Sequence, residues 1–318
     1  MLVLALLLAC APPPEEGRYP LDDVLRLNHV QALGTHNSYH VAGDPPGLED
    51  WDYTHAPLVT QARDQGVRQF ELDFHQDDAN GTFPVYHIAV MDEGSTCATL
   101  AECLAPIAAW SHAHPAVLPL TFLLEPKDDG GGDPITRYDL LEEAILAAWP
   151  DAITPAEVRG SHATLREAIT AEGGWPLLGD VRGRALFLLL DSREHREAYR
   201  ARGEGVLFLN AEDETSPDAA FFLRDDPFDE RIGPLLDAGF LVRTATEDGV
   251  EAVRDGQTER RDQALESGAH FLSTDFPVPD DTTGYAVTLE GGTPARCNAR
   301  TAPGECTPEA VEDPALVD

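Results

Sequence analysis

Eight short apolar runs of strand-like composition alternate with amphipathic stretches along most of this 318-residue chain. The predicted strands cover residues 30–35, 67–74, 84–89, 118–125, 185–191, 206–210, 240–244 and 270–275. Helical periodicity marks residues 56–65, 100–112, 138–149, 228–238 and 260–267 between them. Strands that alternate with helices form βαβ units around a parallel sheet. Eight such units over about 250 residues match a single-domain, TIM-like (β/α)8 barrel, and we predict this α/β fold.

A doubly wound parallel sheet is the competing architecture. Its first strand usually leads into a Gly-rich turn that binds phosphate. Here the corresponding turn reads Gly34-Thr35-His36-Asn37, so it carries His and Asn instead. We therefore favour a barrel over residues 28–299, followed by an acidic tail at 300–318. We expect the part of the tail after Cys306 to fray.

The first ten residues form an apolar run that ends at Cys10. The run is shorter than the roughly 20 residues of a membrane-spanning helix and has the length of a signal-peptide core. Residues 7–10, Leu-Leu-Ala-Cys, resemble the cleavage box of bacterial lipoproteins, in which the Cys is lipidated. We expect residues 1–10 to direct export, residues 11–27 to be a Pro-rich spacer, and the protein to be a cell-envelope lipoprotein or secreted.

The remaining cysteines form two locally spaced pairs, Cys97 with Cys103 and Cys297 with Cys306. Each pair would close a short loop as a disulfide, which suits an oxidising compartment. Zinc is the alternative, but neither pair has the spacing of a zinc site.

The net charge is −35. Nucleic-acid phosphates would be repelled by such a chain, and an anionic membrane would not attract it electrostatically. We interpret the excess as a solvated acidic surface. No protein partner can be inferred from the sequence.

Carboxylates collect near the predicted strand ends, where a barrel carries its active site. Glu71 and Asp73 are two apart on one strand and so point to the same face, and Glu125 ends the strand that we number fourth. Buried carboxylates require a cation or a proton. With the amide oxygen of Asn37 they make an all-oxygen set that suits Ca²⁺, in preference to Mg²⁺ or zinc.

Two histidines accompany this set, His36 after the first strand and His87 at the end of the predicted third strand. Histidine beside a cation suggests acid–base chemistry. Lys127, the single lysine of the chain, follows Glu125 by two residues. It could bind a phosphate oxygen or form a salt bridge with Glu125.

Several segments together resemble the bacterial calcium-dependent branch of phosphoinositide-specific phospholipase C. The resemblance covers roughly residues 28–299, and any one segment alone would be weak. The segments are GTHNSYH (34–40), GVRQFELDFH (66–75), VYH (85–87), PLTFLLEPK (119–127), WSHAHP (110–115), SGA (267–269), STDFP (273–277) and RCN (296–298).

The resemblance implies a TIM-like barrel that cleaves a phosphodiester between diacylglycerol and inositol phosphate. It matches Asn37, Glu71, Asp73 and Glu125 to calcium ligands. His36 and His87 match the catalytic pair, in which His36 stabilises the phosphorane or assists deprotonation and His87 protonates the leaving alkoxide. The product would be a cyclic inositol phosphate, open to further hydrolysis.

Some positions bear on specificity. Eukaryotic relatives carry lysines for the headgroup phosphates on the fifth strand, and the predicted fifth strand here (residues 184–191) has none. That favours phosphatidylinositol or a glycosyl-inositol form over the bisphosphate. Lys127, Arg243 on strand 7 and Asp275 at the end of strand 8 are candidate contacts to substrate. The substrate and a lipid anchor would bring the enzyme to a membrane surface.

Two other functions stay open. One is a different barrel phosphodiesterase, of the glycerophosphodiesterase or sphingomyelinase D type, whose first strand typically ends in His-Arg-Gly instead of His36-Asn37-Ser38. The other is a barrel that binds headgroups without turnover, which would not need both histidines and all three carboxylates.

Overall fold

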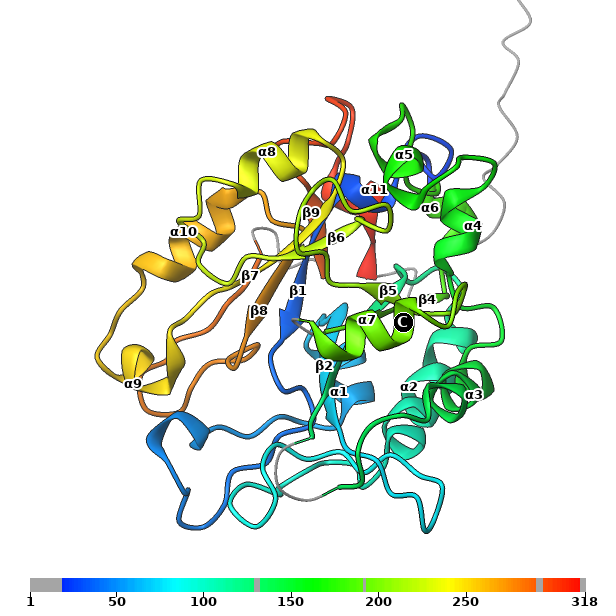
Figure 1. Cartoon of the computed structure of the whole chain (residues 1–318). Helices are drawn as coiled ribbons and strands as arrows, with labels where there is room; N and C mark the ends of the chain where they lie inside the picture. The colour runs from blue at the N-terminus through cyan, green and yellow to red at the C-terminus, as the bar shows by residue number, and fades with distance from the viewer. Residues whose placement is uncertain (1–18, 129–131, 191–192, 290–293, 315–318) are drawn as a thin grey trace, which may run out of the picture.

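The computed structural model describes residues 19–128, 132–190, 193–289 and 294–314, and its centre is a ring of eight parallel strands (Figure 1). The strands are β1 (Val30–Thr35), β2 (Gln69–Phe74), β3 (Leu120–Pro126), β4 (Ala185–Leu189), β5 (Phe208–Leu209), β6 (Phe221–Leu223), β7 (Leu241–Ala245) and β8 (Phe271–Thr274). Their order around the sheet is β5-β4-β3-β2-β1-β8-β7-β6. An isolated parallel bridge between Asn210 and Phe221 joins the two ends of this order. The predicted TIM-like barrel is confirmed, nearly closed.

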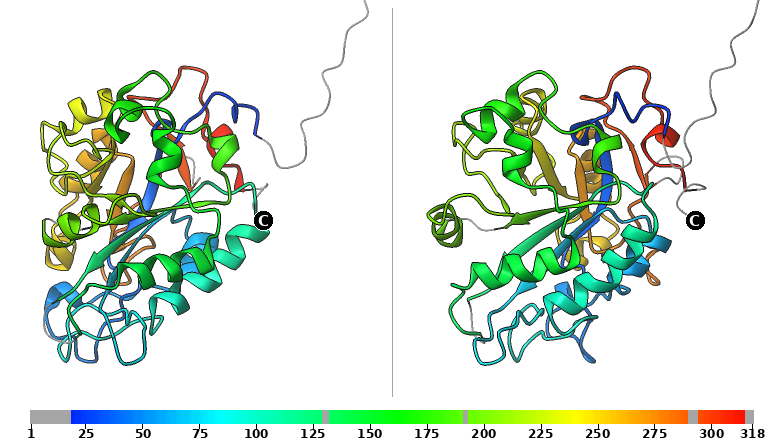
Figure 2. Two further views of the ribbon diagram at one scale, coloured as in Figure 1. Left: turned by 45° about the vertical axis from the view of Figure 1, so that its right-hand side comes forward. Right: turned by 90° about the vertical axis from the view of Figure 1, so that its right-hand side faces the viewer.

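Helices lie around the outside of the strands in all three views (Figures 1 and 2). They are α1 (Leu58–Asp64), α2 (Leu100–Ala113), α3 (Tyr138–Ala148), α4 (Pro155–Arg159), α5 (Leu165–Thr170), α6 (Leu178–Val181), α7 (Glu194–Arg200), α8 (Ile232–Asp237), α9 (Gly249–Arg254) and α10 (Glu259–Ser267), with 3-10 turns η1 (Leu27–His29) and η2 (Glu49–Trp51). No helix in these ranges combines the length and apolar character that crossing a bilayer requires.

Strand β2 shows why the sequence alternates. Phe70, Leu72 and Phe74 are fully buried in the core shared with α1, α2 and α3. The residues between them, Glu71 and Asp73, take the opposite face of the strand, because side chains alternate along a strand. One strand therefore supplies both the core and the polar interior of the barrel.

The predicted strand at 84–89 is wrong. This segment makes only isolated bridges, such as Phe74 with Val85 and Pro84 with Thr99, and lies in the connection between β2 and α2. The strand that brings the barrel to eight is instead β6, the sixth in chain order. It has three residues, and the sequence did not predict it. Consequently His87 lies on a loop, and Glu125 lies on the third strand instead of the fourth. The strand that begins at Ala185 is the fourth, not the fifth, and Asp191 lies outside the described residues.

A short strand, β9 (Ala295–Cys297), pairs antiparallel with the first half of β1. The following segment does not fray as predicted, at least as far as residue 314. Helix α11 (Pro308–Val311) buries its last two residues, and fully buried Glu312 accepts a hydrogen bond of 3.0 Å from Arg68 Nε. Because an unpaired buried charge is costly, this ion pair fixes the segment against the start of β2.

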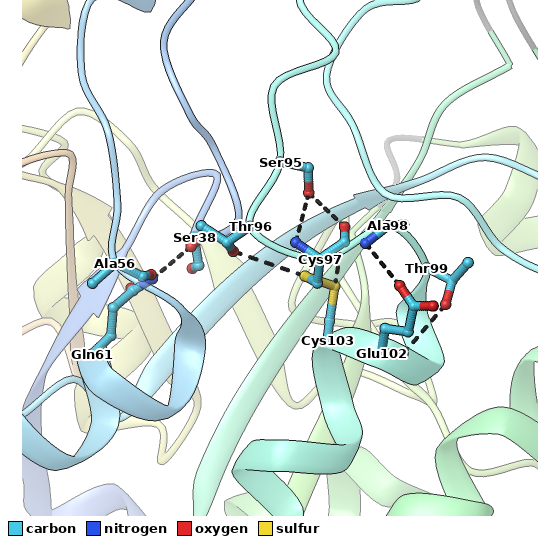
Figure 3. The surroundings of a disulfide bond; sticks show 10 residues. All are labelled: Ser38, Ala56, Gln61, Ser95, Thr96, Cys97, Ala98, Thr99, Glu102 and Cys103. Atoms are coloured by element: carbon cyan, nitrogen blue, oxygen red, sulfur yellow. Dashed lines mark hydrogen bonds between the residues drawn. A yellow bond between two sulfur atoms is a disulfide. The ribbon is translucent and has the colours of Figure 1, made fainter.

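Both predicted disulfides are present. Cys97–Cys103 joins the β2–α2 connection to the first turn of α2 (Figure 3). Beside it, Thr99 caps the helix by accepting a hydrogen bond from the Glu102 N–H, and Glu102 accepts one from the Ala98 N–H. These two hydrogen bonds satisfy backbone N–H groups at the N-terminus of α2 and fix where the helix begins. Cys10 and the export signal lie outside the described residues.

Candidate active site

The turn after β1 sets the first functional residues in place. A Cβ on Gly34 would lie 2.2 Å from Gln69 Oε1, so a larger residue here would require the Gln69 side chain on β2 to move. Ser38 then bonds both backbone groups of Glu71: its N–H donates to the Glu71 carbonyl at 2.8 Å, and its Oγ accepts from the Glu71 N–H at 2.8 Å. Asn37, which directly precedes Ser38 in this turn, has a φ of 39°. The turn therefore holds Asn37 against the end of β2.

Three carboxylates converge beside this turn. Glu71 and Asp73 on β2 are buried, and Asp73 stands directly opposite Glu125 in the β2–β3 register. Oxygens of all three lie within 4.8 Å of one another. Burial raises the pKa of Asp73 well above its usual range, and the neighbouring Glu125 carboxylate raises it further. Burial likewise raises the pKa of Glu71, against the opposing influence of Arg243. The cluster therefore favours a bound positive charge.

Two basic side chains contact these carboxylates. Arg243, buried on β7, donates to Glu71 Oε2 at 2.8 Å and to Ser273 Oγ at 2.9 Å, and it also pairs with Asp225. Lys127 Nζ lies 2.7 Å from Glu125 Oε1 and 3.1 Å from Asp73 Oδ2. The salt bridge between Lys127 and Glu125, one of the two predicted roles of Lys127, is confirmed. Arg243 was predicted as a substrate contact, and in this structure its charge faces the carboxylates.

The arrangement fits a hard divalent cation. Among the described residues, the buried Oδ1 atoms of Asn37 and Asp73 have no hydrogen-bond partner, although a buried polar atom is costly unless it is satisfied. Together with Glu71 and Glu125 they offer oxygens only, which is the donor set that Ca²⁺ takes in proteins. Two unsatisfied oxygens that accompany converging carboxylates are the residues' own indication of a cation site.

His36 borders the carboxylates on one side. Its Nδ1 lies 2.9 Å from Asp275 Oδ1, and its Nε2 lies 3.8 Å from Glu71 Oε1. Burial alone would lower the pKa of His36, but the two carboxylates outweigh it and raise the pKa above the usual range. The His36 side chain is 43% exposed at the barrel mouth, so its ring can contact a ligand.

His87 is held by a different carboxylate. Its Nδ1 lies 2.9 Å from Asp92 Oδ2, while His40 Nε2 lies 3.0 Å from the same group. Asp92 is buried, so it is anchored between two imidazoles. Burial lowers the pKa of His87, and the hydrogen bond to Asp92 only partly opposes that effect. Trp51 meets the His87 ring edge to face at 5.6 Å.

The two histidines open on one cavity of about 290 Å³. Asn37, Arg243 and Asp275 also line it, whereas Lys127 does not. Further acidic side chains line it too: Asp50, Asp225, Glu247 and Asp248. The structure thus gathers the predicted residues around one barrel mouth, with Lys127 below it among the carboxylates.

Sequence reasoning missed two acidic residues. Asp92 lies in the β2–α2 connection, where the false strand at 84–89 obscured its proximity to His87. Half-buried Glu247 accepts from the Asp275 N–H at 2.5 Å and from Tyr285 Oη at 3.1 Å, behind the carboxylate that holds His36. These contacts lie on loops or join residues far apart in the sequence, so no local sequence pattern identifies Asp92 or Glu247 as part of the site. His40, which ends the segment at residues 34–40, also contacts Asp92.

Solved structures with this fold include three structures of two bacterial enzymes at low identity. A calcium-dependent phosphoinositol-specific phospholipase C from Pseudomonas sp. is 17% identical with a TM-score of 0.60, over 89% of this chain and 98% of that chain. Its myoinositol complex is 16% identical with a TM-score of 0.60, over 90% and 100%. A Ca²⁺-dependent phosphatidylinositol-specific phospholipase C from Streptomyces antibioticus is 21% identical with a TM-score of 0.56, over 79% and 95%. These likenesses support the fold.

A search of the curated proteins returns no match. The family model for "Phosphoinositide phospholipase C, Ca2+-dependent" matches residues 25–85 and 82–299. These ranges span the barrel from the residues before β1 to those after β9, and they contain every carboxylate, amide and imidazole of the site. The chain therefore belongs to the Ca²⁺-dependent phosphoinositide phospholipase C family.

Proposed function

We propose that this protein cleaves phosphatidylinositol-type lipids to diacylglycerol and a cyclic inositol phosphate, using Ca²⁺ and two histidines. The observation that carries the proposal is the convergence of an all-oxygen cation site with His36 and His87 at one barrel mouth. A barrel that only binds headgroups would not need two imidazoles each fixed by its own buried acid, Asp275 and Asp92.

Ca²⁺ bound by Asn37, Glu71, Asp73 and Glu125 would lower the pKa of the inositol 2-hydroxyl and neutralise phosphate charge. The 2-hydroxyl oxygen forms a bond to phosphorus as the bond from phosphorus to the diacylglycerol oxygen breaks. His36, kept cationic by Asp275, stabilises the charge on the phosphorus oxygens, and a carboxylate of the site such as Glu71 takes the proton of the 2-hydroxyl. His87 donates a proton to the departing oxygen.

The lowered pKa of His87 bears on its role as a donor. Before substrate arrives, burial favours the neutral ring. A phosphodiester anion beside the ring favours the protonated form, because an opposite charge at short range raises the pKa of an imidazole. Substrate binding would therefore help to load the proton that the leaving group needs.

The cavity favours a headgroup without extra phosphates. Five acidic side chains line it against two arginines, Arg243 and Arg260, and strand β4 supplies no lysine. Both arginines are already paired with acidic side chains, Arg243 with Glu71 and Asp225 and Arg260 with Asp226. Additional phosphates on the ring would therefore meet a net negative lining, and like charges repel strongly in a partly desolvated site. We therefore propose phosphatidylinositol or a glycosyl-inositol phosphate as substrate in preference to the bisphosphate.

The test is an assay of purified protein on phosphatidylinositol vesicles with chelator and then with added Ca²⁺, with the products identified. We expect cyclic inositol phosphate only when Ca²⁺ is present. Release of choline or glycerol phosphate instead would indicate a different barrel phosphodiesterase. His87→Ala should lose at least a hundredfold in kcat, in line with typical acid–base contributions of about 10²–10⁴. Unchanged activity in this variant would remove His87 from the mechanism.

Glu71→Gln tests the cation site separately. It keeps the shape of the side chain but removes one of the three charges that attract a divalent ion. We expect the Ca²⁺ concentration needed for half-maximal activity to rise by about tenfold or more, with activity recovered at high Ca²⁺. Full wild-type activity in chelator would contradict the metal site.

Export and lipidation at Cys10 are proposals on sequence grounds alone. The apolar run and the Leu-Leu-Ala-Cys segment support them. Intact-mass analysis of the native protein should find a lipidated Cys10 at the mature N-terminus. A cytosolic protein that retains Met1 would overturn the proposal.

A further inference from the structure

We propose that Lys127 is a built-in counter-cation that Ca²⁺ must displace, so that this one side chain sets the calcium affinity of the site. The inference rests on the proposed function insofar as it takes Asp73 and Glu125 as Ca²⁺ ligands. It goes further by assigning Lys127 a role in metal binding instead of in contact with substrate.

The Lys127 ammonium contacts carboxylate oxygens that a metal ion would need as ligands. Its Nζ is 2.7 Å from Glu125 Oε1 and 3.1 Å from Asp73 Oδ2, two of the three carboxylates that converge within 4.8 Å. The side chain is 16% exposed and Asp73 is fully buried, so water screens these charges little. The Lys127 N–H donates to the Phe74 carbonyl at 3.0 Å, which fixes its backbone to the end of β2. The lysine is therefore an integral part of the cluster.

An ammonium and a divalent ion cannot share these oxygens freely. The hydrogen bond to Glu125 occupies a lone pair that a metal would coordinate, and the ammonium also lies against Asp73 Oδ2. The two cations would repel each other across a few ångströms of partly buried space. Binding of Ca²⁺ by Asp73 and Glu125 therefore requires that the Lys127 ammonium move away. The free energy of breaking its two ion pairs is subtracted from the affinity for Ca²⁺.

Arg243 does not share this role. Its guanidinium is held by three partners, Glu71, Asp225 and Ser273, and is buried on β7. Lys127 has a flexible stem with a point charge, which can leave its partners one at a time. Every other basic residue among the 22 lysines and arginines of the chain is arginine. The cation that Ca²⁺ displaces is thus a lysine, whereas the fixed cation is an arginine.

The alternative is a purely structural salt bridge. In that case Lys127 would balance charge both without and with Ca²⁺, and its removal would lower stability without tightening Ca²⁺ binding. Calorimetric titration of the decalcified full-length chain with Ca²⁺ separates the two. The variants are Lys127→Met, which keeps the length of the stem, and Lys127→Arg, which keeps the charge.

We expect Lys127→Met to bind Ca²⁺ about tenfold more tightly than wild type, or better, because no competing cation remains. Lys127→Arg should bind no more tightly than wild type. Arg63→Met is the matched control: it also removes one positive charge, but from an exposed residue paired with its neighbour Asp64. The control should stay within about threefold of wild type, since exposed charges are screened. An unchanged or weaker affinity in Lys127→Met overturns the proposal.

Wild-type protein offers a second readout that does not depend on folding of a variant. Because Lys127 is the single lysine, reductive methylation with ¹³C-formaldehyde labels only its side chain and the chain's N-terminus, with the charge retained. We expect the lysine NMR signal to shift towards that of solvated dimethyl-lysine as Ca²⁺ is added, with the same midpoint as the calorimetry. A signal that stays unchanged through Ca²⁺ saturation contradicts displacement.

Failure of this inference is distinguishable from failure of the proposed function. Tighter Ca²⁺ binding in Lys127→Met together with no cleavage of phosphatidylinositol would sink the proposed substrate but support the counter-cation. Cleavage that depends on Ca²⁺, with equal Ca²⁺ affinity in wild type and Lys127→Met, would support the enzyme and sink the counter-cation.

Discussion

At the residue scale, each imidazole of the site is paired with one buried acid, but the two pairs have different electrostatics. His36 lies between Asp275 and Glu71, whose charges outweigh burial and raise its pKa. His87 has Asp92 alone, and burial outweighs this hydrogen bond and lowers its pKa. The two rings therefore present different charges to a substrate. A cationic ring that faces the phosphate and a ring that is loaded by the phosphate suit two different steps.

Asp92→Asn tests this division. Asp92 supports the protonated form of His87, so the amide should lower the pKa of His87 further. If His87 acts as proton donor, kcat/KM is lost as pH rises through the pKa of His87 in the free enzyme, which lies below its usual 6.5. We expect the variant to shift this falling limb to lower pH and to lose about tenfold or more of activity at pH 7, since one pH unit changes the protonated fraction about tenfold.

The control for this variant is Asp237→Asn, which alters an exposed aspartate on helix α8 that pairs with Arg300. The pH profile of this control should match that of the wild type. The Asp92→Asn profile needs measurement over the whole acid range, together with KM. A lower kcat with an unshifted limb would mean that Asp92 only orders the loop. A limb that moves to higher pH would reverse the assigned roles.

At the element scale, the strands that could be predicted are those whose local pattern determines their structure. The runs that became β1, β2, β3, β4, β7 and β8 are apolar, are buried on both faces and were predicted within a few residues. The segment at 84–89 has the same local composition, yet it lies outside the barrel because its backbone is paired with Phe74 and Thr99 by isolated bridges only. Strand β6 has three residues, too few to show any periodicity. The loop at 84–89 and the strand β6 both depend on pairing with segments elsewhere in the fold, and a short stretch of sequence carries no information about that pairing.

The connection between β2 and α2 is the element that makes the site complete, and the disulfide Cys97–Cys103 closes its end. It carries His87 and Asp92, and among the described residues it is tied to the barrel by bonds such as Thr96 N–H to the Tyr39 carbonyl at 2.8 Å. The double variant Cys97→Ser, Cys103→Ser should lose about 2 kcal/mol of stability through loop-closure entropy. It should also lose activity, because a looser connection misplaces His87.

The second disulfide provides the matched control. Cys297 and Cys306 are nine residues apart, against six for the first pair, so their removal should cost a similar free energy of unfolding, about 2–3 kcal/mol. This pair joins β9 to the segment before α11, away from the residues that line the cavity. Urea unfolding and kcat of both double variants should therefore show similar losses of stability and unequal losses of activity. Equal activity losses would mean that the β2–α2 connection is not specially dependent on its disulfide.

At the scale of the whole molecule, the alternation of strands and helices was sufficient to predict the barrel, and the motifs were sufficient to predict which residues meet at its mouth. What they could not predict is most of the charge pairing. The salt bridge of Lys127 with Glu125 was one of two predicted alternatives, but its second contact, with Asp73, was not predicted. Arg243 was expected to contact substrate, yet it pairs with Glu71 of the cluster. Likewise the segment after Cys306 reads as a solvated tail, while Glu312 in it forms a buried pair with Arg68. Such pairings join residues far apart in sequence, and composition carries no information about them.

The net charge of −35 leads to a prediction for the molecule as a whole. Exposed pairs such as Arg137–Asp139 contribute little to stability, and salt weakens them. The unpaired acidic excess repels itself in the compact state, and salt weakens that repulsion too. With 57 acidic against 22 basic residues, the excess exceeds the number of pairs that can form, so repulsion should dominate. We expect Tm in chelator to rise by roughly 5 °C or more as NaCl increases from about 0.01 M to about 1 M, over which the screening length falls from about 30 Å to 3 Å. KCl at equal ionic strength should give the same curve, since screening does not depend on the identity of the monovalent cation. A Tm that falls with either salt would mean that the surface ion pairs, and not the acidic excess, dominate the electrostatics of the folded protein.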